Sequence, residues 1–478
     1  MKFLGKDPNI TDAYYTATAS GAITAGKPVI AEADGDVAQV AFSSASAGAA
    51  TVFHDASTGS IAIAYDSTAQ KIVVFYRDIA NSSYGTAQVG TISGTSISFG
   101  TATVFESAST SNLDATFDSN AGKTVVAYSY STLSGKAVVG TVSGTSISFG
   151  TAAMFENARI DSTAIAFDSD ENRSVIAYKD RGNSNYGTAI VGTISGTSIS
   201  FGSASVFHSG TTTSIGATYD TTAQKVVIGY RDSSNTGDAI VADVSGTTLT
   251  YGTGVQFTAN NALDIKVTHD STAGKNVFVY RDGTETDGKA VVGTVTASDN
   301  SISFGTVQTF KDNAIDDPVV IYDSSANNVL IVYEDTSGTT KLSFLTATLS
   351  GTTFTFGSSI DIVSEDASEP RIAYDANADK SAVVYSASTD SDKGKYAVLA
   401  NDSTNLTSEN YIGIADDTYA DNADATIGIV GCIDRNQTGL TAGQQYYVQT
   451  DGTLSTTADD PSVLAGTAIS ATELVVKE

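Results

Sequence analysis

Seven aspartates recur about every fifty residues, each directly after an aromatic residue or a histidine. They are Asp66, Asp118, Asp168, Asp220, Asp270, Asp323 and Asp375. A ring of carboxylates can hold a hard cation such as Ca²⁺. An aspartate that opens a tight turn, however, commonly accepts a hydrogen bond from the backbone two residues on. We therefore interpret these aspartates as turn residues, with the lysine that closes many of the turns as charge partner. The sequence predicts no metal site and no cofactor.

The residue types that usually perform catalysis form no recognisable motif. No pair of the three histidines has metal-ligand spacing, and no Gly-x-Ser-x-Gly segment occurs. Pairs such as Arg77-Asp78 could meet an acidic ligand, but they recur with the repeat instead of converging, which is typical of strand ends. Sialidases combine an arginine cluster with an Asp motif that contains Trp, whereas this chain has no Trp. We predict no catalytic residue and a protein that is not an enzyme.

Two loops carry side chains suited to binding. Asn81 and Tyr84 lie in the first, and Arg181, Asn183 and Tyr186 lie at matching places in the second. A tyrosine beside Asn and Ser is an adaptable contact for a sugar or a protein. The alternative is that each tyrosine folds over its own loop. We take these five residues as candidate ligand-binding residues.

Composition and charge exclude several classes of protein. The formal net charge is −28, from 53 acidic against 25 basic residues, which would repel a phosphate backbone, so we predict no nucleic-acid binding. The single Cys432 cannot form an intramolecular disulfide. Residues Met1–Asp7 lack the apolar run of a signal peptide, and no segment has the length of a bilayer span. We expect synthesis in a cytoplasm, without a signal peptide or membrane insertion.

Four short strands in each repeat would position these residues. In the first complete repeat they are residues 61–65, 71–76, 86–92, and 96–99 continuing to 103–105, all with β-branched content and alternating polarity. Seven such repeats predict a seven-bladed β-propeller. An open solenoid is the rival. The last repeat lacks its fourth strand, however, and Gly48–Phe53 matches Gly100–Phe105. We therefore predict that residues 48–53 close the last blade and remove both free sheet edges.

Similar passages occur at both chain ends. Thr24-Ala25-Gly26 precedes a short apolar run and Asp34-Gly35, and Thr441-Ala442-Gly443 precedes Tyr446-Tyr447-Val448 and Asp451-Gly452 at the same spacing. Each predicts a turn, a strand and an Asp-Gly turn. We infer an all-β chain in which the propeller, residues 44–403, is inserted into a small β domain. Residues 1–43 and 404–478 form the two halves of that domain.

The turns and loops of the repeats divide into two sets. Turns between first and second strands and between third and fourth strands are nearly uniform, whereas loops between second and third strands vary in length and content. Function on a rigid scaffold tends to lie in such varied loops. We therefore expect recognition at the varied end of the sheets, with the terminal domain at the uniform end.

The C-terminal passage, together with the closing segment Ala465–Leu474, resembles domains of tailed-bacteriophage virion proteins. The start of the chain shows a fainter likeness. The resemblance implies a virion structural protein, such as a tail fibre or a capsid-surface appendage, assembled in the host cytoplasm. It also implies contact with other virion proteins through the terminal domain, and several copies or a homo-oligomer on the particle. It carries over no catalytic residue.

Three functions follow from these expectations. The first is an exposed fibre or appendage whose varied propeller face binds a ligand, such as a host-surface glycan or protein. The second is a capsid decoration protein with purely structural contacts. The third is a glycan-degrading propeller enzyme, for which the sequence supplies no residues.

Overall fold

The computed structural model describes residues 13–131, 133–459 and 461–477. The N-terminal residues Met1–Asp7, on which the signal-peptide expectation was based, lie outside this range. In the described residues the fold is all-β, and the helical element is the short 3₁₀ turn η1 (Ser388–Asp390). Contacts divide the chain into two compact units. One is Ala45–Asn401, and the other combines Met1–Ser44 with Asp402–Glu478.

The sheet in the middle of the larger unit illustrates its repeating element. β15 (Ile160–Asp168), β16 (Arg173–Asp180) and β17 (Tyr186–Ser195) are antiparallel neighbours in that order. The outer edge of β17 pairs with both β18 (Ser198–Phe201) and β19 (Ser205–Thr211). The fourth strand of the sheet is therefore split in two. Apolar residues such as Val175, Ile176 and Ala177 are buried along β16 on both of its faces, as expected of a strand covered by sheets on either side.

The same arrangement recurs along the larger unit. The other first strands are β6 (Thr51–Asp66), β10 (Thr103–Asp118), β20 (Thr213–Asp220), β25 (Ala262–Asp270), β30 (Ile315–Asp323) and β35 (Ala367–Asp375). The other second strands are β7 (Lys71–Asp78), β11 (Lys123–Tyr130), β21 (Lys225–Arg231), β26 (Lys275–Asp282), β31 (Asn328–Asp335) and β36 (Lys380–Ala387). The other third strands are β8 (Tyr84–Ser93), β12 (Ser134–Ser143), β22 (Gly237–Ser245), β27 (Gly288–Thr296), β32 (Lys341–Ser350) and β37 (Lys393–Ala400).

The remaining short strands of this unit lie at the outer edges. They are β5 (Ser46–Ala47), β9 (Ser96–Phe99), β13 (Ser146–Phe149), β14 (Ala153–Glu156), β23 (Thr248–Tyr251), β24 (Val255–Thr258), β28 (Ser301–Phe304), β29 (Gln308–Lys311), β33 (Thr353–Phe356) and β34 (Ile360–Val363). β6 and β10 are long because each begins at the outer edge of one sheet and ends as the first strand of the next.

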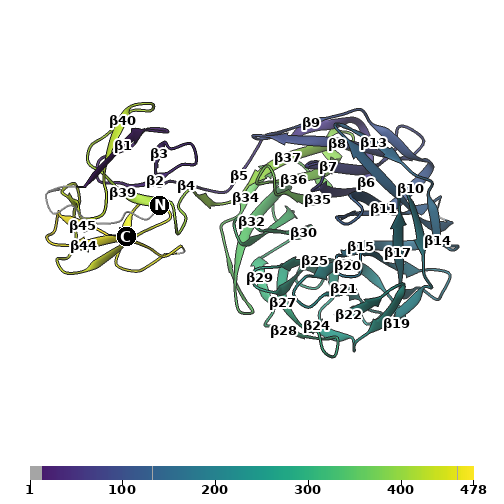
Figure 1. Ribbon diagram of the computed structural model, residues 1–478. Helices are drawn as coiled ribbons and strands as arrows, with labels where there is room; N and C mark the ends of the chain where they lie inside the picture. The colour runs from purple at the N-terminus through teal and green to yellow at the C-terminus, as the bar shows by residue number, and fades with distance from the viewer. Residues whose placement is uncertain (1–12, 132, 460, 478) are drawn as a thin grey trace. The chain divides into compact units, whose positions relative to one another are not determined.

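The first strands contact one another in chain order, and β35 contacts β6 (Figure 1). At this junction the start of β6 pairs with β37, placing Val52 opposite Lys395 and Thr51 opposite Tyr396. This is the pairing that the match between Gly48–Phe53 and Gly100–Phe105 predicts. The beginning of the unit thus supplies the outer strand of its last sheet, so that no third strand is left as an open edge there.

Neighbouring sheets are joined by aromatic pairs. Phe155, at the outer edge of one sheet, packs against Tyr178 on the second strand of the next, with ring centroids 5.3 Å apart. The pairs Phe53–Tyr76, Phe105–Tyr128, Phe207–Tyr230, Phe257–Tyr280 and Phe310–Tyr333 repeat this contact. The recurring tyrosine is therefore the anchor between sheets, and each hydrophobic cluster draws on two adjacent sheets.

The unit that contains both chain ends has two five-stranded sheets. The first has the order β1 (Tyr14–Thr18), β40 (Asp424–Gly428), β39 (Tyr411–Ala415), β2 (Pro28–Ala31) and β3 (Val37–Gln39). The second has the order β41 (Ile433–Asp434), β45 (Leu474–Val476), β44 (Val463–Ala468), β42 (Gln445–Val448) and β43 (Leu454–Ser455). β4 (Phe42–Ser43) pairs with β38 (Ser403–Thr404). Strands from both ends of the chain thus pair within this unit.

The two similar passages of the sequence adopt the same local structure. Lys27 N–H donates to the Thr24 carbonyl, as Gln444 N–H donates to that of Thr441. Each first turn contains a glycine with positive φ, Gly26 or Gly443, and each Asp-Gly turn contains another, Gly35 or Gly452. β2 and β42 lie between the respective turns. The turn, strand and Asp-Gly turn expected from the sequence are therefore confirmed in both places.

Candidate functional site

The turn between the first and second strands is built in the same way throughout the larger unit. Its aspartate is buried, and its Oδ1 accepts backbone N–H groups two or three residues on, as Asp270 does from Thr272 and Ala273 at 3.0 and 2.8 Å. The same holds for Asp66, Asp118, Asp168, Asp220, Asp323 and Asp375. The interpretation of these residues as turn builders is confirmed. Within the described residues, no group of three or more His, Cys, Asp or Glu could hold a metal ion.

The charge partner expected for these aspartates was predicted wrongly. Lys225, which closes the turn opened by Asp220, makes its ion pair with Asp243 at 2.7 Å. Asp220 instead accepts from the Asn276 side chain of the next sheet at 2.7 Å. The reason is burial, because a buried turn carboxylate is reached by neighbouring amides and backbone N–H groups, whereas a lysine keeps its ammonium group near water.

The two loops with candidate ligand-binding residues have one conformation. In the first, Asp78 accepts from Asn81 N–H, and Tyr84 N–H donates to the Asn81 carbonyl, both at 3.1 Å. In the second, Asp180 likewise accepts from Asn183 N–H, and Tyr186 N–H donates to the Asn183 carbonyl. In both, two residues before the tyrosine have positive φ. Asn81 and Asn183 are exposed, and Tyr84 and Tyr186 are half-buried.

The structure does not bring the five candidate residues together. Asn81 and Tyr84 belong to the β7–β8 sheet, and Asn183 and Tyr186 to the β16–β17 sheet, with the sheet of β11 and β12 between them in chain order. The Arg181 side chain is exposed but forms an ion pair with Asp161, which also binds Arg159 at 3.2 Å. The five residues therefore lie in two similar loops that belong to separate sheets.

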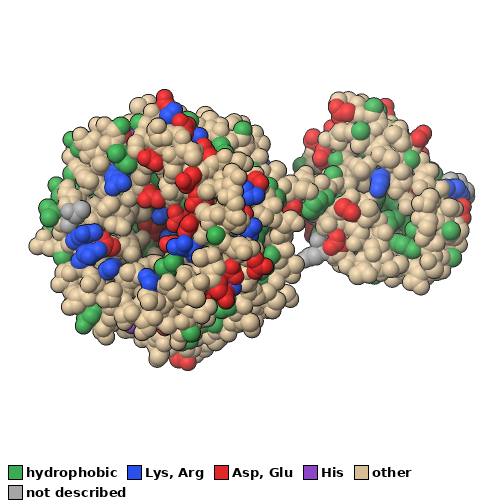
Figure 2. Space-filling model, turned by 180° about the vertical axis from the view of Figure 1, so that it is seen from behind, with side chains coloured by type: hydrophobic (Ala, Val, Ile, Leu, Met, Phe, Trp, Pro, Cys, Tyr) green, Lys and Arg blue, Asp and Glu red, His purple; other side chains and the backbone are tan. Residues whose placement is uncertain are grey.

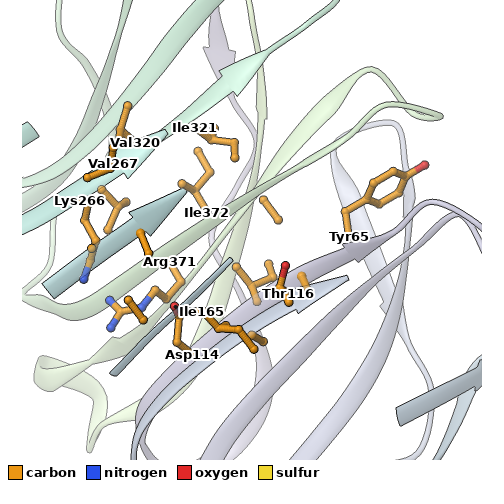
Figure 3. Close-up of a pocket in the computed structure, with 18 of the residues that line it drawn as sticks. Tyr65, Asp114, Thr116, Ile165, Lys266, Val267, Val320, Ile321, Arg371 and Ile372 are labelled. Carbon is orange, nitrogen blue, oxygen red and sulfur yellow. Dashed lines mark hydrogen bonds between the residues drawn. The ribbon is translucent and has the colours of Figure 1, made fainter. Parts of the chain in front are cut away.

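A cavity of about 410 Å³ lies where the first strands meet (Figure 3). We call it the axial cavity. Aliphatic side chains from five of the first strands line its middle: Ile63, Ile165, Val267, Val320 and Ile372. The rings of Tyr65, Phe117, Tyr322 and Tyr374 line it near the turns opened by the buried aspartates. Its volume falls in the range of small-molecule sites.

Three charged side chains line the opposite end of the axial cavity: Asp114, Lys266 and Arg371, which converge in Figure 3. Asp114 accepts from Ile165 N–H at 2.8 Å, and Arg371 donates to the Pro370 carbonyl at 2.8 Å. Burial raises the pKa of the Asp114 carboxyl and lowers the pKa of the Lys266 ammonium. Arg371 lowers the pKa of Lys266 further, whereas Asp114 opposes that shift.

A bulge interrupts each first strand two residues before this charged layer. The bulge residue has positive φ in every first strand although none is glycine: Ser60, Asn112, Ser162, Ser214, Asp264, Asp317 and Glu369. A bulge residue in this conformation is usually glycine, so these positions are strained. On β25, β30 and β35 the bulge residue is acidic. Acidic side chains gather around the central hollow of this unit in Figure 2, with basic groups inside it.

The acidic bulges are linked to their neighbours by a small polar network. Arg281 lies between Asp316 of the next sheet, at 2.7 Å, and Asp264 of its own, at 3.6 Å. Asp317 accepts from Glu369 N–H at 3.2 Å. The Glu369 Oε2 atom is buried and has no hydrogen-bond partner. This oxygen can therefore still accept a hydrogen bond.

Glu334, at the end of β31, is buried beside this network. Its Oε1 accepts from Ala367 N–H at 3.0 Å. Burial raises the pKa of Glu334 to about 8, and the hydrogen bond it shares with the Asp366 carboxyl acts in the same direction. A protonated Glu334 can donate to Asp366, which relieves the repulsion between two carboxylates.

Reasoning from the sequence missed the axial cavity and its charges. Aligning the first strands places Asp114, Lys266 and Arg371 at one position, where the other copies have Ala62, Ala164, Gly216 and Val319. A charge at a position that otherwise holds small or apolar residues was the available signal. The signal was weak because the three charges lie on strands distant in sequence, and only closure of the sheets brings them together.

Comparison with known proteins identifies the fold class but no family or function. No family model and no curated protein matches the chain. Among solved structures, the crystal structure of the BP39L lectin from Burkholderia pseudomallei is similar, with a TM-score of 0.54 at 8% sequence identity. The match covers 74% of this chain and 99% of that chain. The likeness shows an all-β, propeller-like fold of repeated four-stranded antiparallel sheets. No helix in the described residues is long and apolar enough to cross a membrane.

Proposed function

We propose that this chain is a ligand-binding protein of a bacteriophage virion: a seven-bladed β-propeller inserted into a small β attachment domain formed by both chain ends. The loops between second and third strands would bind a host-surface ligand, such as a glycan. The observation that carries this proposal is the difference between the two ends of the sheets. Buried aspartates hold the turns at one end in a single form, whereas the loops at the other end differ and present exposed polar side chains.

The circuit of first strands supports the proposed blade number. β6, β10, β15, β20, β25, β30 and β35 contact one another in order, and the last contacts the first. The pairing of β6 with β37 across the ends of the unit supports a closed propeller over an open solenoid.

The virion assignment rests on the C-terminal passage and its likeness to phage domains. Thr441-Ala442-Gly443, Tyr446-Tyr447-Val448 and Asp451-Gly452 form the turn, the strand β42 and the Asp-Gly turn that the likeness calls for. A small domain built from both ends of a chain suits an attachment domain that carries an inserted propeller. Its contacts would be with other virion proteins, in several copies on each particle.

A binding role is favoured over a catalytic one by the state of the acidic residues. Asp264 and Asp316 are held by Arg281, and the turn aspartates by backbone N–H groups. The neighbour named as a lectin is consistent with sugar binding by a propeller-like fold. Capsid decoration remains the second candidate, and it differs in placing the varied loops against coat subunits.

Binding of the full-length chain to an array of bacterial surface glycans tests the proposal. Replacing two equivalent contacts, Tyr84→Ala with Tyr186→Ala, should weaken binding at least tenfold, since truncating a contact tyrosine costs about 1–3 kcal/mol. The control pair is Ser143→Ala with Ser195→Ala, in exposed turns at the uniform end, which should change affinity less than twofold. Equal loss in both pairs, or no glycan bound at all, would contradict recognition of a glycan by these loops.

A further inference from the structure

The axial cavity has the composition of a site for an amphipathic molecule. The aliphatic side chains of Ile63, Ile165, Val267, Val320 and Ile372 line its middle. A hydroxyl or an amide held against these side chains would lose hydrogen bonds to water and gain none from them, which is costly. The middle of the cavity therefore favours an apolar group.

The charged end of the cavity has an excess of hydrogen-bond donors. Among the described residues, the Lys266 ammonium has no hydrogen-bond acceptor and no carboxylate within ion-pair distance. Arg371 uses one N–H on the Pro370 carbonyl, and no carboxylate of the described residues pairs with it. Asp114 is occupied by Ile165 N–H. Two cationic groups thus face the cavity beside a single carboxylate.

The acidic bulge residues do not line the cavity wall. Asp264 and Glu369 precede Lys266 and Arg371 by two residues on β25 and β35, so they lie about 7 Å further along the strands. They are on the side of the charged layer that is away from the apolar wall. The charges of Asp264 and Asp317 oppose the burial that lowers the pKa of the Lys266 ammonium. The charged groups that face a ligand from the cavity wall are therefore Lys266, Arg371 and Asp114.

We propose that the axial cavity binds a small carboxylic acid with an apolar tail. The carboxylate lies between Lys266 and Arg371 and accepts their free N–H groups. The tail extends between the isoleucine and valine side chains toward Tyr65 and Tyr374. This site is distinct from the varied loops and does not depend on the function proposed for them.

Other ligand classes fit these groups less well. An amine would bring a third positive charge to Lys266 and Arg371, and a sugar would place hydroxyls against aliphatic walls. A neutral alcohol fits the tail region but forms no charge-assisted hydrogen bond, and such bonds are roughly twice as strong as neutral ones. The head group therefore decides binding.

Isothermal titration calorimetry of the full-length chain with hexanoate, 1-hexanol and hexylamine tests the proposal, because the three share one tail. Hexanoate should bind at least tenfold more tightly than hexanol, and hexylamine most weakly. Binding of all three with equal affinity would overturn the role of the charged end, and tightest binding of hexylamine would show that the acidic bulges dominate. Failure of all three to bind would overturn the site itself.

A pair of variants distinguishes loss of head-group binding from loss of the cavity itself. Lys266→Met keeps the length of the side chain and should reduce hexanoate affinity at least tenfold while changing hexanol affinity less than twofold. The control is Lys225→Met, which removes a lysine already paired with Asp243 outside the cavity and should leave both affinities unchanged. Loss of hexanol binding in Lys266→Met would indicate a collapsed cavity, and the comparison of head groups on the unaltered protein then decides the question.

Discussion

The pKa of Glu334 is set by its burial and by the neighbouring Asp366 carboxyl. Glu334 is 7% exposed and lies beside the Asp366 carboxyl, so its raised pKa follows from burial first and from its neighbour second. A carboxyl whose folded-state pKa exceeds its ordinary value holds its proton more tightly in the folded protein. Stability is then fully present below the ordinary pKa and is lost as pH rises through the folded one.

We expect the stability of the chain to fall between about pH 4.5 and pH 8 through this residue. Glu334→Gln cannot ionise, keeps an acceptor for Ala367 N–H and donates to Asp366. At pH 8.5 the variant should melt several degrees above the unaltered chain, while at pH 4.5 the two should agree within about 1 °C. Differential scanning calorimetry at both pH values measures this. Glu409→Gln, at an exposed site, is the control, and an equal pH response in both variants would argue against the raised pKa of Glu334.

At the residue scale, local chemistry was predictable and long-range assembly was not. The turn role of Asp66 and its equivalents follows from an aspartate and the few residues after it, all visible in the sequence. The burial of these aspartates depends on neighbouring sheets, and the pairing of Lys225 with Asp243 depends on the register between β21 and β22; both were missed. Lys266 and Arg371 are separated by more than a hundred residues, and nothing local marks them as neighbours.

The strands show a similar division at the scale of elements. The repeat and its alternating polarity predicted four strands per copy, and the structure confirms them. The split of the fourth strand was indicated by the interval between residues 99 and 103, where the chain bends at Gly100. The contact between Phe155 and Tyr178 joins adjacent sheets and could not be read from either strand alone.

The glycine at the bend of the outer strand fixes how closely neighbouring sheets approach. A Cβ atom on Gly150 would lie 1.8 Å from the Thr197 carbonyl oxygen of the next sheet, whereas one on Gly338 would meet nothing within 4 Å. Gly150→Ala should therefore cost about 1–3 kcal/mol, since the backbone must shift. Gly338→Ala should change stability by less than about 0.5 kcal/mol. Urea denaturation of both variants measures this. Equal stabilities would mean that the sheets can move apart at Gly150 at no cost in free energy.

At the scale of the whole molecule, the pairing of the first and last sheets arranges similar sheets so that their uniform turns lie at one end and their varied loops at the other. Without the pairing of β6 with β37, the third strand of the last sheet would expose its backbone groups and invite aggregation. Closure also creates the axial cavity, since each first strand contributes only a strip of its wall. The proposed division of labour follows, with uniform turns as scaffold and varied loops as recognition surface.

Electron cryomicroscopy of virus particles that carry this chain tests the proposed recognition role most directly. We expect the loops containing Tyr84 and Tyr186 to face solvent, and the unit formed by both chain ends to contact the particle. Those loops buried against coat subunits would contradict the account, because the surface assigned to recognition would then be an assembly contact.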